Sequence, residues 1–182
     1  KHVIAGSLGK WKLTAESGKY QQIEFEFKGV YAAITDASAP TVTLLSQLPA
    51  VWMNSYLNIQ NYSAVIDKWD IDWETTVSQR DDATASTGIK GFVITDRSPK
   101  GSCDPEGESV ATHDFFGKLL ASTESVAGFT LGATSGNIIH ISMPKIQYSD
   151  VNYGDRQGLQ TFSVPYAING NTGDDEIMMI FA

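Results

Sequence analysis

The chain has 182 residues, enough for one domain with a substantial apolar core. It carries 13 lysines and arginines against 21 aspartates and glutamates, and the net charge of -8 argues against binding to nucleic acid or to an anionic membrane. Cys103 is the only cysteine, which excludes an intramolecular disulfide and a cysteine-rich zinc site.

The N-terminal part of the chain predicts a hairpin of two strands. Residues 10–15 alternate polar and apolar side chains up to a turn at residues 16–19. Residues 20–28 then place Ile23, Phe25 and Phe27 on one face and acidic or basic residues, among them Glu24 and Glu26, on the other. We therefore expect a half-buried strand whose apolar face, including Phe25, lies in the core.

A long loop over residues 35–55 follows, where the alternation is lost. This loop is rich in apolar side chains, which argues against disorder. We expect them to pack on a neighbouring chain rather than on their own chain. The candidate subunit-contact residues are Leu44, Leu45, Leu48, Val51 and Trp52.

Residues 65–77 predict one long strand with Trp69 and Trp73 on its core face. Its opposite face carries Asp70, Asp72 and Glu74, spaced about 6.5 to 7 Å apart by strand geometry. Such a row could ligate a hard cation or supply the paired acids of a glycosidase. A solvated sheet face is the simpler interpretation, because neither use is specified by spacing alone.

Residues 112–122 predict a helix, with Thr112 as N-cap and Asp114 near its positive end. Its apolar face is formed by Phe115, Phe116, Leu119 and Leu120. The last strand, residues 177–182, is apolar on both faces, so the sheet, a helix or another subunit must cover it, and Phe181 is expected in the interior. The fold class is therefore all-β with one helix: an antiparallel β-sandwich or flattened barrel of about ten strands with a single packed α-helix.

Residues that could carry catalysis do not form a motif. His113 is expected at the surface and His140 in a strand with a satisfied partner, and neither belongs to a nucleophile or metal motif. Ser102 and Cys103 lack a nucleophile elbow, and residues 174–176 lack the spacing of a calcium loop. We expect no enzymatic activity, no cofactor and no metal.

Three stretches, in this order, resemble the tail tube (major tail) proteins of long-tailed bacteriophages and prophages. The first, at residues 6–40, is GSLGKWKLTAESGKYQQIEFEFKGVYAAITDASAP, with a glycine turn, an alternating strand and an F-x-G-x-Y ending. The second is ITDRSPKG at residues 94–101, with the helix soon after, and the third comprises SGNIIHISMPKIQY, DRQGLQTFSVPY and GDDEIMMIFA. Family members carry additional sequence before the position of Lys1. The resemblance therefore implies that residues 1–182 are one tail-tube-like β domain, the larger C-terminal part of such a protein.

The resemblance implies a structural virion protein whose hexameric rings stack into a tail tube, the conduit for DNA ejection. Its partners would be further copies of itself and the tape measure and tail terminator proteins, with no membrane and no specific DNA binding. It would be assembled in the bacterial cytoplasm and reside in the virion tail. An acidic lining would repel phosphates, so the candidate lumen-facing row is Asp70, Asp72, Glu74, Glu24 and Glu26.

Two other functions compete with this interpretation. One is a non-catalytic β-sandwich that binds carbohydrate or a receptor, with Trp52, Tyr56 and Trp73 as a stacking platform. The other, ranked last, is a metal-dependent hydrolase that uses Asp70 and Asp72.

Overall fold

The computed structural model describes residues 1–43 and 48–182. The chain is mainly β with one short helix, which confirms the predicted fold class. The strands are β1 (His2–Glu16), β2 (Gln22–Ile34), β3 (Tyr56–Ile59), β4 (Lys68–Asp72), β5 (Thr75–Asp81), β6 (Ile89–Arg97), β7 (Lys100–Cys103), β8 (Glu124–Leu131), β9 (Ile139–Tyr148), β10 (Asn152–Arg156), β11 (Leu159–Asn169) and β12 (Met178–Phe181). The helix is α1 (Phe115–Leu120).

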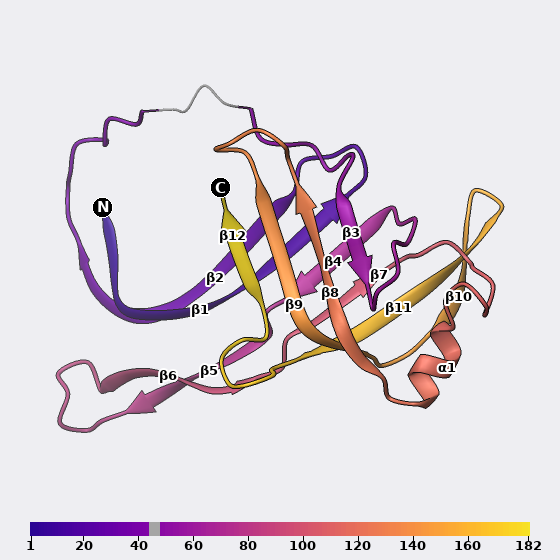
Figure 1. Cartoon of the computed structure of the whole chain (residues 1–182). Coiled ribbons are helices and arrows are strands. Elements are labelled where there is room, and N and C mark those ends of the chain that lie inside the picture. The colour runs from indigo at the N-terminus through magenta and orange to yellow at the C-terminus, as the bar shows by residue number, and fades with distance from the viewer. Residues whose placement is uncertain (44–47) are drawn as a thin grey trace.

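Ten strands form one curled antiparallel sheet (Figure 1). Their order is β2-β1-β4-β7-β11-β9-β8-β3, with β10 paired to β11 and β12 paired to β9. Within the described residues, β5 and β6 pair only with each other, and this hairpin projects from the body of the molecule (Figure 1). Because strands β3, β8 and β9 cross in front of β4, β7 and β11, the sheet encloses a core between its two halves.

Trp69 of β4 lies at the centre of this core and is fully buried. Its ring centroid is 5.4 Å from that of Phe129 on β8, and its indole N–H donates to the hydroxyl of Tyr166 on β11. On β1, Leu13 lies opposite Ile71 of β4, and both are fully buried. The alternating residues that predicted half-buried strands therefore do fill the interior in this part of the sheet.

Residues 65–77 do not form one strand, contrary to the prediction. Strand β4 ends at Asp72 and β5 begins at Thr75, and between them the chain leaves the large sheet for the projecting hairpin. The backbone N–H of Trp73 donates to the carbonyl of Trp11 at 2.9 Å. Trp73 is consequently half-buried and stacked on Trp11 instead of lying in the core. A period of two continues through both strands, so the pattern alone does not reveal the change of sheet.

Helix α1 is shorter than predicted. Asp114, not Thr112, is its N-cap, and the Asp114 carboxylate accepts from the backbone N–H of Gly117 at 2.7 Å. Phe115 is buried, but Leu120 is 86% exposed, so the predicted apolar face covers the sheet only in part. Within the described residues no helix has the length and apolar character needed to cross a bilayer.

His113, expected at the surface, is buried directly before the helix. Its Nε2 lies 3.1 Å from the Tyr148 hydroxyl, and its ring stacks on Tyr62 with 4.8 Å between centroids. Burial, with a smaller contribution from the charge of Lys118, lowers the pKa of His113 to about 4. The imidazole is therefore neutral at pH 7 and acts as part of the core.

Candidate interaction surface

The apolar face of β2 extends beyond the core. Ile23 is half-buried, whereas Phe25 and Phe27 are 61% and 59% exposed. The register places Phe25 opposite Trp11 and Phe27 opposite Gly9 of β1, so the face that begins in the core continues along the hairpin. No described element of the chain covers it there, which corrects the expectation that Phe25 is a core residue.

The same hairpin exposes further apolar side chains toward its far end. Ile4 and Tyr31 lie opposite each other and are 50% and 64% exposed, and Ile34 is 58% exposed. Single exposed apolar residues are ordinary, but a contiguous group marks a surface that binds something. We call Phe25, Phe27, Tyr31 and Ile34 the exposed apolar face of β2.

Strand β12 has the same character. It pairs with β9 along one edge, and its other edge is unpaired among the described residues. Met178, Ile180 and Phe181 are 44–64% exposed, so Phe181 does not lie in the interior as predicted. A strand with no polar face needs to be covered by the sheet, a helix or another subunit. Within the described residues, the sheet covers β12 only in part.

An apolar groove of about 310 Å³ separates β12 from the β1–β2 hairpin. We call this the apolar groove; its lining is Trp11, Ile23, Phe25, Trp73, Ile177, Met179 and Phe181. Trp11 and Trp73 stack within it, with 5.9 Å between ring centroids and 5° between ring planes. The groove therefore lies between β12 and the exposed apolar face of β2, which it reaches at Phe25.

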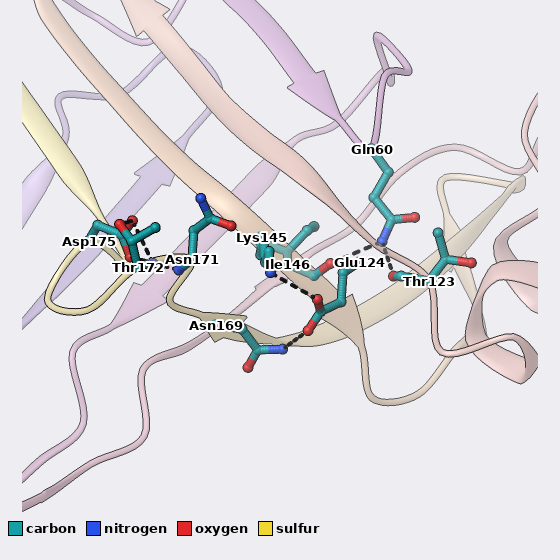
Figure 2. Close-up of polar contacts among 9 residues, drawn as sticks. All are labelled: Gln60, Thr123, Glu124, Lys145, Ile146, Asn169, Asn171, Thr172 and Asp175. Atoms are coloured by element: carbon teal, nitrogen blue, oxygen red, sulfur yellow. Dashed lines mark hydrogen bonds and ion pairs between the residues drawn. The ribbon is translucent and has the colours of Figure 1, made fainter.

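Polar contacts fix the position of Trp73 in the groove and the conformation of the loop that leads into β12. The guanidinium of Arg97 lies 5.8 Å from the ring centroid of Trp73 and forms ion pairs with Asp174 and with Glu176, the latter at 3.2 Å. Asp175 accepts from the backbone N–H groups of residues 171 and 172, at 2.7 and 3.1 Å, as Figure 2 shows. These backbone bonds lower the pKa of Asp175 and fix the turn that positions β12.

The predicted acidic row lies on the opposite, polar face of the sheet. The strand register places four of the acids on this face, and Glu74 joins them through its ion pair with Lys100. Lysines of the same strand or of a neighbouring strand separate the acids. Glu26 pairs with Lys10 at 3.3 Å, Asp70 with Lys68 at 3.0 Å and Glu74 with Lys100 at 2.5 Å, while Lys12 lies in register between Glu24 and Asp72. The face thus alternates in charge and is not uniformly negative. Lys68 stands two residues before Asp70 on the same strand, but the placement of Lys10, Lys12 and Lys100 between the acids depends on the strand order.

One row of this face can be followed across most of the sheet. Residues paired directly in register lie on the same face, and they run Glu24, Lys12, Asp72, Lys100, Ala167, Gln147 and Glu124. At the end of the row, Glu124 accepts from Asn169 at 2.8 Å and pairs with Lys145 at 3.5 Å (Figure 2). These contacts pair the charges at this end of the row, whereas Glu24, Lys12 and Asp72 lie beside one another in register.

The structure describes three of the five candidate subunit-contact residues. Leu44 and Leu45 lie outside the described residues, Leu48 is 77% exposed and Val51 is half-buried. Trp52 is 5% exposed and packs on Phe129 of its own core, with 5.7 Å between ring centroids. Its side chain therefore stabilises the fold itself. The proposed sugar-stacking platform also loses Trp52, because a buried side chain cannot stack on a sugar. Tyr56, its second member, is 69% exposed.

The residues weighed for catalysis lie in structural positions. Cys103 is buried, and burial raises the pKa of its thiol far above the usual range. The Nδ1 atom of His140 lies 2.7 Å from the Thr130 hydroxyl, which satisfies the expected strand partner. Across residues 1–43 and 48–182, no three acidic, histidine or cysteine side chains are grouped to hold a metal ion.

Comparison with known proteins gives limited information. No protein-family model and no curated protein matches the chain. A chain in the solved structure "Virion of native gene transfer agent (GTA) particle" is 13% identical with a TM-score of 0.43, covering 70% of this chain and 93% of that chain. A chain in "Tail of empty GTA particle computed with helical refinement, C6 symmetry" is 14% identical with a TM-score of 0.41, covering 65% and 83% respectively. Identities and TM-scores this low decide neither the family nor the function.

Proposed function

We propose that this chain is a structural subunit that associates with copies of itself to form a tail tube, as the resemblance of its sequence implies. One structural observation carries the proposal: the apolar groove and the exposed apolar face of β2 form one continuous surface that the described chain leaves uncovered. A surface of this kind is unfavourable in water and is typical of an interface.

Four exposed aromatic side chains supply a large part of the area that a stable contact needs. Phe25, Phe27, Tyr31 and Phe181 are each about 60% exposed. At roughly 200 Å² per aromatic residue they present about 500 Å² of surface. A standard interface buries about 800 Å² on each partner, so these four side chains supply a large part of one.

The polar face of the sheet is the proposed lining of the tube. Binding to DNA rests mainly on cations that neutralise phosphates, and here each of the lysines Lys10, Lys12, Lys68 and Lys100 has an acidic neighbour. Such a face does not hold the nucleic acid, which suits a conduit. The proposal retains Asp70, Asp72, Glu74, Glu24 and Glu26 as lumen-facing residues, now as members of a face of alternating charge.

Electron microscopy and light scattering of the protein test the assembly. We expect rings or tubes with six subunits per ring, as the resemblance implies. Strictly monomeric protein at high concentration and across salt conditions would contradict the proposal. Copurification with tape measure and tail terminator proteins from virion tails would test the partners and the location.

Charge reversal tests the lining. If the polar face lines the lumen, Glu24→Lys and Asp72→Lys leave assembly intact but make the assembled tubes retain DNA in a salt-sensitive way. Asp36→Lys, at an exposed loop position outside this face, is the matched control. Equal DNA retention by the control and the two variants would show that the polar face is not the lining.

A further inference from the structure

The β5–β6 hairpin is a second element that its own chain covers only in part, since it contacts β1 and β2 but pairs with neither. It is a separate two-stranded sheet, and in Figure 1 it extends away from the large sheet. Isolated two-stranded hairpins are at best marginally stable in water, so an extended one gains from a partner surface. Val93 and Ile94 are adjacent in β6 and are 37% and 43% exposed. Since neighbouring strand residues point to opposite faces, the hairpin presents an apolar side chain on each of its faces.

The hairpin cannot readily cover the apolar groove of its own chain. Its first strand begins at Thr75, two residues after Trp73, and its second ends at Arg97, which lies over the Trp73 ring. Both ends are therefore anchored at the groove, and the hairpin leads away from it (Figure 1). The hairpin contacts β1 and β2 of its own chain, but none of its residues lines the apolar groove.

We propose that the β5–β6 hairpin of one copy docks onto the apolar groove and the exposed apolar face of β2 of a second copy. This inference rests on the proposed self-assembly and specifies which surfaces of two copies meet. The lengths agree, because β5 and β6 have 7 and 9 residues, about 23 to 30 Å, and the stretch from Phe25 to Ile34 spans about 30 Å. Because Val93 and Ile94 point to opposite faces of β6, one of them meets the apolar surface of the second copy.

The contact has a consequence for symmetry. Donor and acceptor are different patches of the same chain, so each copy offers a hairpin to one neighbour and a groove to another. Such a head-to-tail contact does not stop at a two-fold dimer; it closes into a ring or continues as a filament. A small apolar molecule would fill the groove but would leave the exposed face of β2 and the hairpin uncovered.

Cross-linking of two single-cysteine variants tests the contact. Val93→Cys, carrying an affinity tag, is mixed with untagged Ala32→Cys on β2, and a bis-maleimide is added. The natural Cys103 is buried with a raised thiol pKa, so it stays unreactive in the folded chain. We expect a tagged–untagged dimer several-fold more abundant than in the control mixture of Val93→Cys with Leu120→Cys, a position on α1 that is 86% exposed.

Electron microscopy of the same mixtures separates the two proposals. Rings or tubes with a cross-linked yield no higher than the control would overturn the hairpin contact and leave the assembly standing. Absence of any assembly would overturn both. If Val93→Cys misfolds, Ser86→Cys in the exposed hairpin loop replaces it, with circular dichroism to verify the fold. A specific product from either hairpin variant supports the contact.

Discussion

Truncation of Phe25 to alanine should weaken assembly far more than it weakens folding. Phe25 is 61% exposed, so the folded monomer buries only about 40% of its side chain. Full burial of a phenylalanine contributes about 1.5 to 3 kcal/mol, so the expected loss in the free energy of unfolding is about 1 kcal/mol. Phe129→Ala is the matched control, because Phe129 is 1% exposed between Trp52 and Trp69. Its loss should be about 3 to 5 kcal/mol.

The effect on assembly follows from the position of Phe25 in the groove. An aromatic side chain at the centre of an interface is often worth about 2 kcal/mol or more. That corresponds to an increase of roughly thirtyfold in the concentration needed for half-assembly. Phe25→Ala should therefore remain folded and monomeric at concentrations where the unaltered chain forms rings or tubes.

Two measurements on each variant decide the matter. Urea unfolding at a concentration below assembly gives the stability of the monomer, and sedimentation velocity over a concentration series gives the assembly. If Phe25→Ala lost as much stability as Phe129→Ala, the apolar face of β2 would be part of the core in solution. If its assembly were unchanged, the face would not be an interface. Either result refutes the reasoning.

Three further predictions concern the core. The pKa of His113 is about 4 in the folded chain and about 6.5 in the unfolded chain, so the unfolded state binds the proton first as the pH falls. The free energy of unfolding should therefore decrease as the pH drops from 6.5 toward 4. His113→Gln should flatten that slope in urea midpoints measured against pH, and an unchanged slope would exclude His113 as its source. Gly101→Ala should lower the melting temperature by several degrees or prevent folding. The new methyl group would meet the Tyr166 ring and lie 2.7 Å from the Asp70 carbonyl oxygen. A melting temperature equal to that of the unaltered chain would contradict this close packing. Cys103 should react with a thiol reagent only at the rate of unfolding, and rapid labelling of the native chain would show that the thiol is accessible.

The sequence by itself determined which face is apolar in the strands around Leu13 and Trp69. Period-two alternation around Leu13 and Trp69 predicts half-buried strands because side chains alternate across a strand, and these residues are indeed buried. The same rule placed Asp70 and Asp72 on the opposite face, where the structure has them. These properties are local, so a single stretch of chain is enough to reveal them.

The tertiary structure alone decided which apolar faces are covered. Phe25 and Trp69 satisfy the same alternation, yet one is 61% exposed and the other fully buried, because cover depends on the strands that cross over each site. Likewise, the break between β4 and β5, the burial of His113 and the lysines between the acids arise from segments distant in the sequence. Alternation specifies that a face is apolar, whereas strand order and curl determine whether the chain itself covers that face.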